Sequence, residues 1–277
     1  MICYNDYCKP FVCGRNFRIS NFDLPITALK KAGCKMYAIK TLGLSKRYKD
    51  ITAVEGLDLE IAKGEFFSLL GLNGAGKTTT VKMLSALTVP TEGDATVGGY
   101  SVTSESERVK SIIGVSPQKT AVAPNLSVRE NLEFMCRLYG FSSEKTERKI
   151  KEMTAELSLG EVLDRKTGKL SGGWGRRVSI AMALICEPEI LFLDEPTLGL
   201  DVIARRELWD TLSKMRGKIT IVMTTHNMEE AEALSDRIGI MKDGRLLDVG
   251  GVRELKEKTG AQNLEAAFIS IVGGDVL

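Results

Sequence analysis

The sequence predicts an α/β protein with a mostly parallel β-sheet. From residue 172 onward, short apolar segments of strand type alternate with helical segments, which is typical of helices that connect parallel strands. Upstream, the apolar run Phe66–Leu70 precedes a glycine-rich turn and a helical segment from about Lys77 to Leu87. The alternating segments before it, residues 37–44 and 53–61, add further strands.

The other elements follow from local pattern. Residues 90–99 predict a turn and an edge strand, and residues 112–116 predict a buried strand. Downstream we expect helices at 172–186, 201–215 and 228–234, and strands at 190–193, 219–224 and 238–241. Asp243-Gly244 is a hairpin turn signal, which predicts a last strand at Arg245–Val249.

A helical lobe is expected between these strands, at about residues 119–168. Ser127 followed by Glu130 is a capping-box pattern that predicts the start of a helix. Leu132, Met135 and Cys136 then fall on one helical face. A charged helical segment continues through residues 143–157. We therefore interpret the lobe as an insertion into the α/β core.

Charge and hydropathy exclude several classes of protein. The net charge is +2, but residues 1–35 hold six Lys/Arg against two Asp/Glu, so the remaining chain is slightly acidic. This balance disfavours a nucleic-acid surface, which needs concentrated positive charge. No apolar run reaches the roughly 20 residues of a membrane span, and no signal peptide is evident. We expect a cytosolic protein whose membrane role requires a partner.

Residues 1–35 differ from the rest and are interpreted as a poorly ordered N-terminal extension, with Met36 as the working start. They contain four of the six cysteines, at spacings that fit no zinc site. We expect free thiols there.

The first chemical motif is the loop at residues 71–78, Gly-Leu-Asn-Gly-Ala-Gly-Lys-Thr. It matches the phosphate-binding pattern G-x-x-x-x-G-K-[ST] in full, between a strand and a helix. Glycines allow backbone N–H groups to surround phosphates, and the helix N-terminus adds partial positive charge. Lys77 is expected on the β- and γ-phosphates, and the Thr78 hydroxyl on Mg²⁺.

The second motif is a pair of acidic residues at the end of the apolar strand 190–193. Asp194 and Glu195 lie at the carboxyl end of a parallel sheet, where α/β proteins bind ligands. Asp194 suits Mg²⁺, which prefers oxygen ligands. Glu195 is expected to orient and activate a water against the γ-phosphate.

The third motif, Leu170-Ser171-Gly172-Gly173-Trp174, opens an apolar helix before that strand. With the two motifs above, it makes residues 37–250 resemble the ATP-binding subunits of ABC transporters. The resemblance implies a P-loop NTPase of ABC type, with an antiparallel β subdomain and the helical lobe. It also implies a domain at 36–255 and a short tail at 256–277.

The resemblance implies a role for each matching residue. Tyr48 would stack on adenine, and Gln118 would contact Mg²⁺ and water and couple the site to the membrane partner. Asp201 lies in the loop that communicates across the dimer, and His226, the only histidine, would grip the γ-phosphate. The expected ATP-binding set is Tyr48, Asn73, Gly74, Ala75, Gly76, Lys77, Thr78 and Thr79, with Ser171, Gly172, Gly173 and Asp201.

The remaining assignments complete this prediction. The catalytic set is Lys77, Gln118, Glu195 and His226, and the Mg²⁺ ligands are Thr78, Gln118 and Asp194. Ser171–Gly173 would bind the γ-phosphate held by a second subunit, so two copies would close around two ATP molecules. The other expected partner is a transmembrane permease, which places the chain at the cytoplasmic face of the membrane; no nucleic acid is expected.

The subgroup rests on three strings of sequence. Residues 195–201, 225–232 and 263–268 resemble subunits that serve ABC-2-type export permeases, such as daunorubicin-resistance-like drug exporters. The spacing of the last string equally fits a packed terminal helix. The alternatives are an importer ATPase and a soluble, non-transport ABC ATPase. Trp174 departs from the usual glutamine, and we expect it to pack against apolar neighbours.

Overall fold

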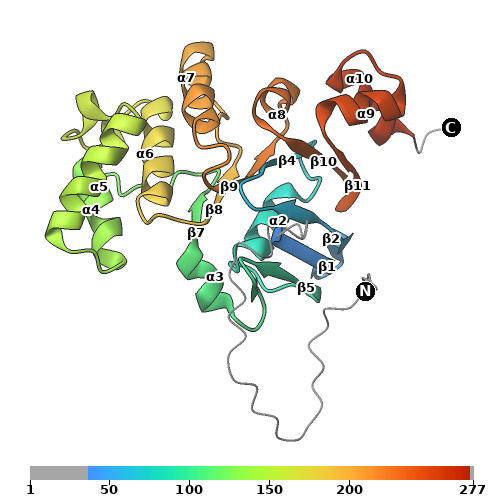
Figure 1. The fold of residues 1–277 in the computed structure, drawn as a ribbon, viewed down its shortest axis with the longest axis horizontal. Helices are drawn as coiled ribbons and strands as arrows, with labels where there is room; N and C mark the ends of the chain where they lie inside the picture. Colours follow the sequence, from blue (N-terminus) through green and yellow to red (C-terminus); the bar gives the residue numbers. More distant parts are fainter. Residues whose placement is uncertain (1–36, 275–277) are drawn as a thin grey trace, which may run out of the picture. The chain divides into compact units, whose positions relative to one another are not determined.

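The computed structural model describes residues 37–274, so the expectations for residues 1–35, for Met36 as the start and for the cysteines there lie outside it. Two sheets organise the described chain (Figure 1). The larger one has the strand order β11-β10-β4-β9-β8-β7. Its strands are β4 (Phe66–Gly71), β7 (Ile113–Ser116), β8 (Ile190–Asp194), β9 (Thr220–Thr225), β10 (Arg237–Lys242) and β11 (Arg245–Gly250).

The larger sheet is parallel from β10 to β7, and only the hairpin strand β11 is antiparallel. All residues of β4, β8 and β9 are buried, because the sheet is covered on both faces. The α/β class with a mostly parallel sheet is thereby confirmed. The covering helices are α2 (Lys77–Leu84), α3 (Ser106–Ile112), α6 (Gly172–Leu184), α7 (Val202–Ser213), α8 (Met228–Leu234), α9 (Val252–Thr259) and α10 (Leu264–Gly273).

The second sheet is antiparallel and is built from the N-terminal strands. Its path is β2-β1-β5-β6, and β3 also pairs with β1. The strands are β1 (Tyr37–Tyr48), β2 (Ile51–Leu57), β3 (Glu60–Ala62), β5 (Glu92–Val97) and β6 (Tyr100–Ser101). Two sequence expectations are corrected here: residues 53–61 form two strands rather than one, and β5 lies between β1 and β6 rather than at an edge. Neither β6 nor α3 was predicted.

The helical lobe lies between β7 and α6. It contains α4 (Val128–Leu138), α5 (Ser143–Glu156) and two 3-10 turns, Gly160–Val162 and Thr167–Lys169. Ser127 and Glu130 form the predicted reciprocal capping box at the start of α4. Leu132 and Cys136 share one buried cluster with residues of α6 and β8. The lobe is therefore packed directly against α6.

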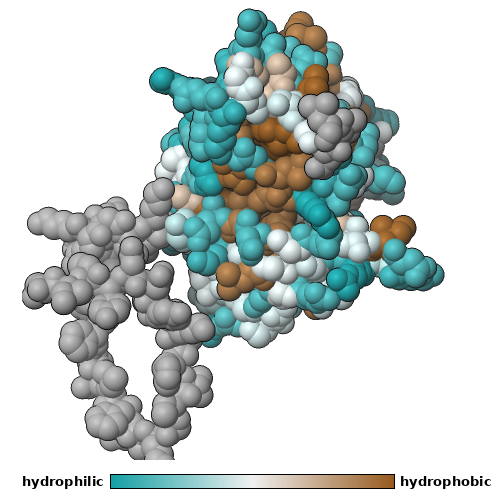
Figure 2. All heavy atoms as spheres, turned by 90° about the vertical axis from the view of Figure 1, so that its right-hand side faces the viewer, coloured by the Kyte–Doolittle hydropathy of each residue, from teal (hydrophilic) through white to brown (hydrophobic). Residues whose placement is uncertain are grey.

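The C-terminal helices belong to the core of the larger sheet. Leu264 and Phe268 of α10 are buried with Leu70, Ile238 and Ile240, so the packed-helix interpretation of this segment is confirmed. The expected boundary at residue 255 falls inside α9. Figure 2 shows the face that carries these helices, where apolar atoms line a hollow between more polar rims. Among the described residues, no helix is both long and apolar enough to cross a membrane.

Candidate active site

The phosphate-loop residues surround the N-terminus of α2. The buried strand β4 ends at Gly71, and α2 begins at Lys77. Gly76, the N-cap residue, has φ +97°, and a Cβ there would lie 2.5 Å from the carbonyl oxygen of Ala53. Only glycine fits this conformation and this close approach. The loop therefore directs backbone N–H groups and the helix N-terminus toward a shared space.

Lys77 lies inside this loop, with 5% of its surface exposed. Its Nζ donates to the carbonyl oxygens of Gly71 (2.7 Å) and Leu72 (3.1 Å), and it is 3.7 Å from Glu195 Oε1. Burial lowers the pKa of Lys77, and the charges of Glu195 and Asp194 oppose that shift. The ammonium is thus held where an anionic group would be a stronger acceptor than these two neutral carbonyls.

The two carboxylates enter from the end of β8. Asp194 Oδ1 accepts hydrogen bonds from Thr78 Oγ1 (3.0 Å) and Thr224 Oγ1 (2.5 Å). The backbone N–H of Glu195 donates to the carbonyl oxygen and the hydroxyl of Thr224. Glu195 has φ +48°, a left-handed conformation that is uncommon for residues other than glycine. The strained turn aims its side chain at Lys77 and His226.

His226 follows β9, and its Nδ1 is 3.2 Å from Glu195 Oε2. The preceding Thr225 is fixed by its hydroxyl, which donates to Glu230 Oε2 at 2.6 Å. Trp209 Nε1 donates to the other Glu230 oxygen, and burial raises the pKa of Glu230. Glu230 thus ties α7 to the segment that carries His226.

Neither Thr224 nor Glu230 was predicted from the sequence as a site residue. Thr224 lies near the carboxyl end of a buried strand, and this position in the sequence was the signal that could have predicted its place in the site. Glu230 lies in the first turn of α8, where a helix-capping role would explain it equally well.

A cavity of about 310 Å³ lies beside Lys77 and Glu195. That volume is at the lower end of small-molecule sites. Its lining contains Asn73, Gly74, Ala75, Gly76, Lys77, Thr78, Thr79, Gln118 and Glu195, together with Ile51, Thr52 and Ala53 of β2. Tyr48 is not part of the lining; it is half-exposed at the end of β1, directly opposite Ile51.

The polar groups at this cavity fit a nucleoside triphosphate with Mg²⁺. A buried ammonium and helix N–H groups match phosphate oxygens, and Thr78 with Asp194 supplies the hydroxyl and carboxylate that Mg²⁺ uses alongside phosphates. Within residues 37–274, no cluster of three His, Cys, Asp or Glu side chains forms a separate metal site. The structure thus brings together all the expected catalytic residues.

Four other predicted ATP-binding residues lie in a second cavity of about 530 Å³. Ser171, Gly172, Gly173 and Asp201 line it, with Trp174 and Arg177 among their neighbours. Ser171 is the N-cap of α6, is exposed, and makes no side-chain hydrogen bond to any described residue. Asp201 caps α7 through Ala204 N at 2.8 Å. The single chain therefore keeps the predicted phosphate-loop residues and these four residues in two separate cavities.

Trp174 packs partly buried against the core cluster of the lobe and α6, as the sequence predicted. The Arg177 guanidinium lies 5.2 Å from the centre of its ring. Arg177 also pairs with Glu207 of α7. The unusual tryptophan is thus part of the wall of the second cavity.

Comparison with known proteins supports these features. The ABC transporter family matches residues 54–198. The phospholipid-transporting ATPase ABCA3 of Homo sapiens is 42% identical over 227 residues, which cover 80% of this chain and 13% of that protein. The daunorubicin resistance ATP-binding protein DrrA3 of Streptomyces coeruleorubidus is 40% identical over 232 residues, covering 83% of this chain and 73% of that protein.

Solved structures that resemble this chain also come from ABC transporter ATP-binding proteins. The ATP-binding subunit of an ABC transporter superposes with a TM-score of 0.77 at 27% identity, covering 84% of this chain and 99% of that one. A dimeric ATP-binding cassette in a post-hydrolysis state, bound to ADP and Pi, has a TM-score of 0.71 at 29% identity and covers 77% of this chain and 98% of its own. Family and fold agree with the geometry of the site. The chain therefore belongs to the ABC transporter family, as an ATP-binding ATPase domain with the P-loop NTPase fold.

Proposed function

We propose that this chain powers a membrane exporter by closing, as a dimer, around two ATP molecules at the cytoplasmic face of the membrane. The observation that carries the proposal is the division of the binding residues between two cavities. One cavity holds Lys77, Thr78 and Glu195, and the other holds Ser171 and Asp201. Two copies placed head to tail would join the first cavity of each with the second cavity of the other.

The first turn of α6 is suited to such a contact. The free hydroxyl of Ser171 and the N-terminal N–H groups of α6 would meet a phosphate held by the partner's loop. Binding would therefore favour the closed dimer, and hydrolysis would release it. The solved dimeric cassette among the structural neighbours supports this arrangement.

Within each site the chain's own residues divide the work. Lys77 and the loop N–H groups hold the phosphates, while Thr78, Asp194 and Gln118 would face Mg²⁺. Glu195 accepts the proton of the attacking water, and His226 holds the Glu195 side chain and grips the γ-phosphate. ATP with Mg²⁺ supplies the phosphoanhydride bond that is cleaved. Tyr48 would contribute an aromatic face to adenine from the rim.

The exporter assignment rests on the relatives. Two Streptomyces proteins that are 40% identical to this chain are named for daunorubicin resistance, and the human relative is named for phospholipid transport. This favours an export permease as the partner over an import permease, and over a soluble ATPase that acts alone.

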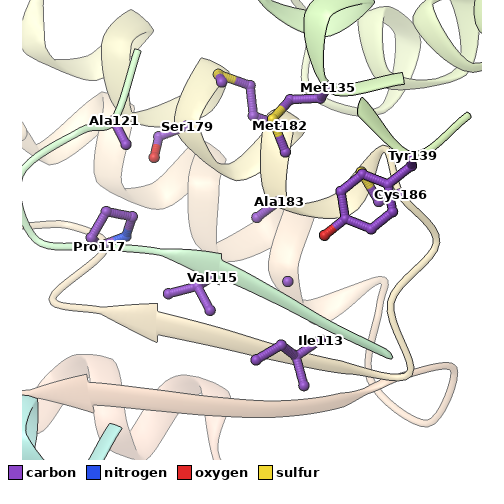
Figure 3. Close-up of a pocket in the computed structure, with 11 residues that line it drawn as sticks. Ile113, Val115, Pro117, Ala121, Met135, Tyr139, Ser179, Met182, Ala183 and Cys186 are labelled. Carbon is purple, nitrogen blue, oxygen red and sulfur yellow. The ribbon is translucent and has the colours of Figure 1, made fainter. Parts of the chain in front are cut away.

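A groove beside the Gln118 loop suits the permease (Figure 3). It lies between α4, α6 and β7, has a volume of about 220 Å³, and is lined by apolar side chains that include Val115, Met135 and Met182. The neighbouring α4 also exposes Phe134 and Leu138. A short apolar segment of the permease would fill this groove and sense the state of the Gln118 loop.

Complementation between two inactive variants tests the dimer. Lys77→Ala removes the phosphate cation from one cavity. Ser171→Asp keeps a good helix cap but places a negative charge in the other cavity. Each variant alone should be inactive.

An equal mixture should recover up to about a quarter of the number of intact sites in the wild type. Half of randomly paired dimers are mixed, and one of the two sites in each mixed dimer is intact. A mixture that stays inactive, while both variants remain folded, would contradict the shared site. Co-expression with the partner permease, followed by transport into inverted vesicles, tests the direction. Substrate accumulation that needs an external binding protein would point to import instead.

A further inference from the structure

Arg176 is a buried cation that the proposed chemistry leaves unused. It lies in the second turn of α6 and is 5% exposed. Among the described residues, no carboxylate lies within ion-pair distance of it. Burial lowers its pKa, and the charges of Asp194, Glu195 and Glu230 oppose that shift. A buried guanidinium needs specific partners, because its desolvation is costly.

Its partners are two consecutive backbone carbonyls of the loop that carries Gln118. Nη1 donates to the Pro117 oxygen and Nη2 to the Gln118 oxygen, both at 2.7 Å. The planar fork of guanidinium matches two such acceptors, and charged donors make strong hydrogen bonds. Arg176 therefore fixes the backbone at the residue whose side chain enters the first cavity.

The same face of α6 is fastened to the strand before this loop. Ser179 Oγ lies 2.9 Å from Ser116 Oγ, and both are buried. One turn further, a Cβ on Gly114 would lie 2.2 Å from the Ala183 oxygen, so helix and strand are in close contact there. Figure 3 shows Ser179 and Ala183 on α6 above β7. Arg176, Ser179 and Ala183 thus form one row at helical spacing.

The loop has few other restraints. Within the described residues, no backbone–backbone hydrogen bond involves Gln118 to Val122. Gln118 and Lys119 are exposed. Arg176 is thus the polar anchor of the part of the loop that leaves the sheet.

We propose that Arg176 is a positioning residue that clamps the Gln118 loop to the first turns of α6, so that Gln118 and Ser171–Gly173 move as one unit. This inference rests on the proposed function, in which Gln118 serves the ATP of its own subunit and Ser171 serves that of the partner. Closure of one ATP site of the dimer would then be transmitted through this clamp to the other ATP site.

Proteolysis of the full chain tests the clamp without any ATPase assay. Arg176→Lys keeps the charge but cannot span both carbonyls. Trypsin cleavage after Lys119, followed by mass spectrometry, should become about tenfold faster in this variant, because opening of the loop becomes easier. Arg216→Lys is the matched control, because Arg216 donates to the backbone oxygen of Leu234 and lines neither cavity. Its cleavage rate after Lys119 should equal that of the wild type.

ATPase kinetics then test whether Arg176 acts through Gln118. Arg176→Lys should lower kcat about tenfold, because small misplacement of a positioned group is costly. The KM for ATP should change less than about threefold, because Arg176 does not contact the phosphate loop. The variant carrying both Arg176→Lys and Gln118→Ala should be no slower than Gln118→Ala alone. Effects that multiply in the double variant would show independent roles and overturn the proposal.

Unchanged cleavage after Lys119 in folded Arg176→Lys would also overturn it. If the buried lysine prevents folding, Arg176→Gln replaces it, since a neutral amide can still donate to one carbonyl. The cleavage rate after Lys119 and the kcat of the double variant with Gln118→Ala then test the proposal in the same way. A wild-type chain without ATPase activity would refute the proposed function, while the cleavage rates would still decide whether Arg176 holds the loop.

Discussion

Glu195→Gln is the most informative single change in this site. The substitution replaces a carboxylate by an amide of nearly the same shape at a position that is 7% exposed. Glu195 Oε1 is 3.7 Å from Lys77 Nζ, and Oε2 is 3.2 Å from His226 Nδ1. The amide can keep the contact to His226 as a hydrogen bond, whereas the 3.7 Å contact to Lys77 is an ion pair that the amide cannot replace. The change therefore removes one charge and one base while the shape of the side chain is kept.

Two magnitudes follow from this geometry. At an effective dielectric constant of about 20, opposite charges 3.7 Å apart attract by roughly 4 kcal/mol before desolvation is counted. Removing that attraction frees Lys77 for phosphate, so ATP binding should be as tight as in the wild type or tighter. Loss of a general base lowers the rate by about 10²- to 10⁴-fold, which raises the barrier by roughly 3 to 5 kcal/mol.

The assay combines steady-state hydrolysis, calorimetric ATP binding and size-exclusion chromatography with ATP. Glu195→Gln should lose turnover, retain binding and accumulate as a closed dimer. Lys77→Ala is the control, because it should lose binding itself. Hydrolysis by Glu195→Gln within about threefold of wild type would refute the role of Glu195 as the base. Binding weakened more than about tenfold would refute the electrostatic reasoning.

Three further predictions concern α6 and the lobe that packs against it. Gly175→Ala should raise the free energy of unfolding by about 1 kcal/mol in urea denaturation, because Gly175 is helical and a Cβ there meets no atom within 4 Å; a lower stability would mean that the first turn of α6 is not helical in solution. Trp174→Gln should cost about 1 to 2 kcal/mol of stability, through lost packing of a half-buried ring, yet leave kcat within about twofold; a large loss of kcat at unchanged stability would assign Trp174 to the chemistry. Glu187 has its pKa lowered to about 2 by hydrogen bonds from Lys145 and Lys149. Its contribution is therefore present above its ordinary pKa and is lost as pH falls toward 2. Because the Glu187 side chain is half-exposed, Glu187→Gln should cost at most about 1 kcal/mol at pH 7, and the difference from wild type should shrink below about pH 4.5 in denaturation curves at several pH values; a difference that persists at low pH would exclude the two ion pairs as its source.

Much of the local structure was predictable because its signals are contiguous. The capping box at Ser127 and Glu130 and the hairpin turn at Asp243-Gly244 occur as expected. Short elements such as β6 and α3 were not predicted, because two and seven residues are too few to show a clear hydrophobic periodicity. The place of β5 inside its sheet could not be predicted either, since strand order depends on pairing between distant segments.

By itself, the sequence determined the chemistry of this protein. The glycines and the lysine of a phosphate loop lie in one short run of sequence, and the acidic pair directly follows one buried strand. Both motifs can therefore be recognised from a few consecutive residues. Only the tertiary structure decided how these parts are distributed. It brought Glu230 behind Thr225 and set Arg176 against the carbonyls of Pro117 and Gln118. The reason is physical: such contacts join residues far apart in the chain, and their energies arise only when packing removes the groups from water.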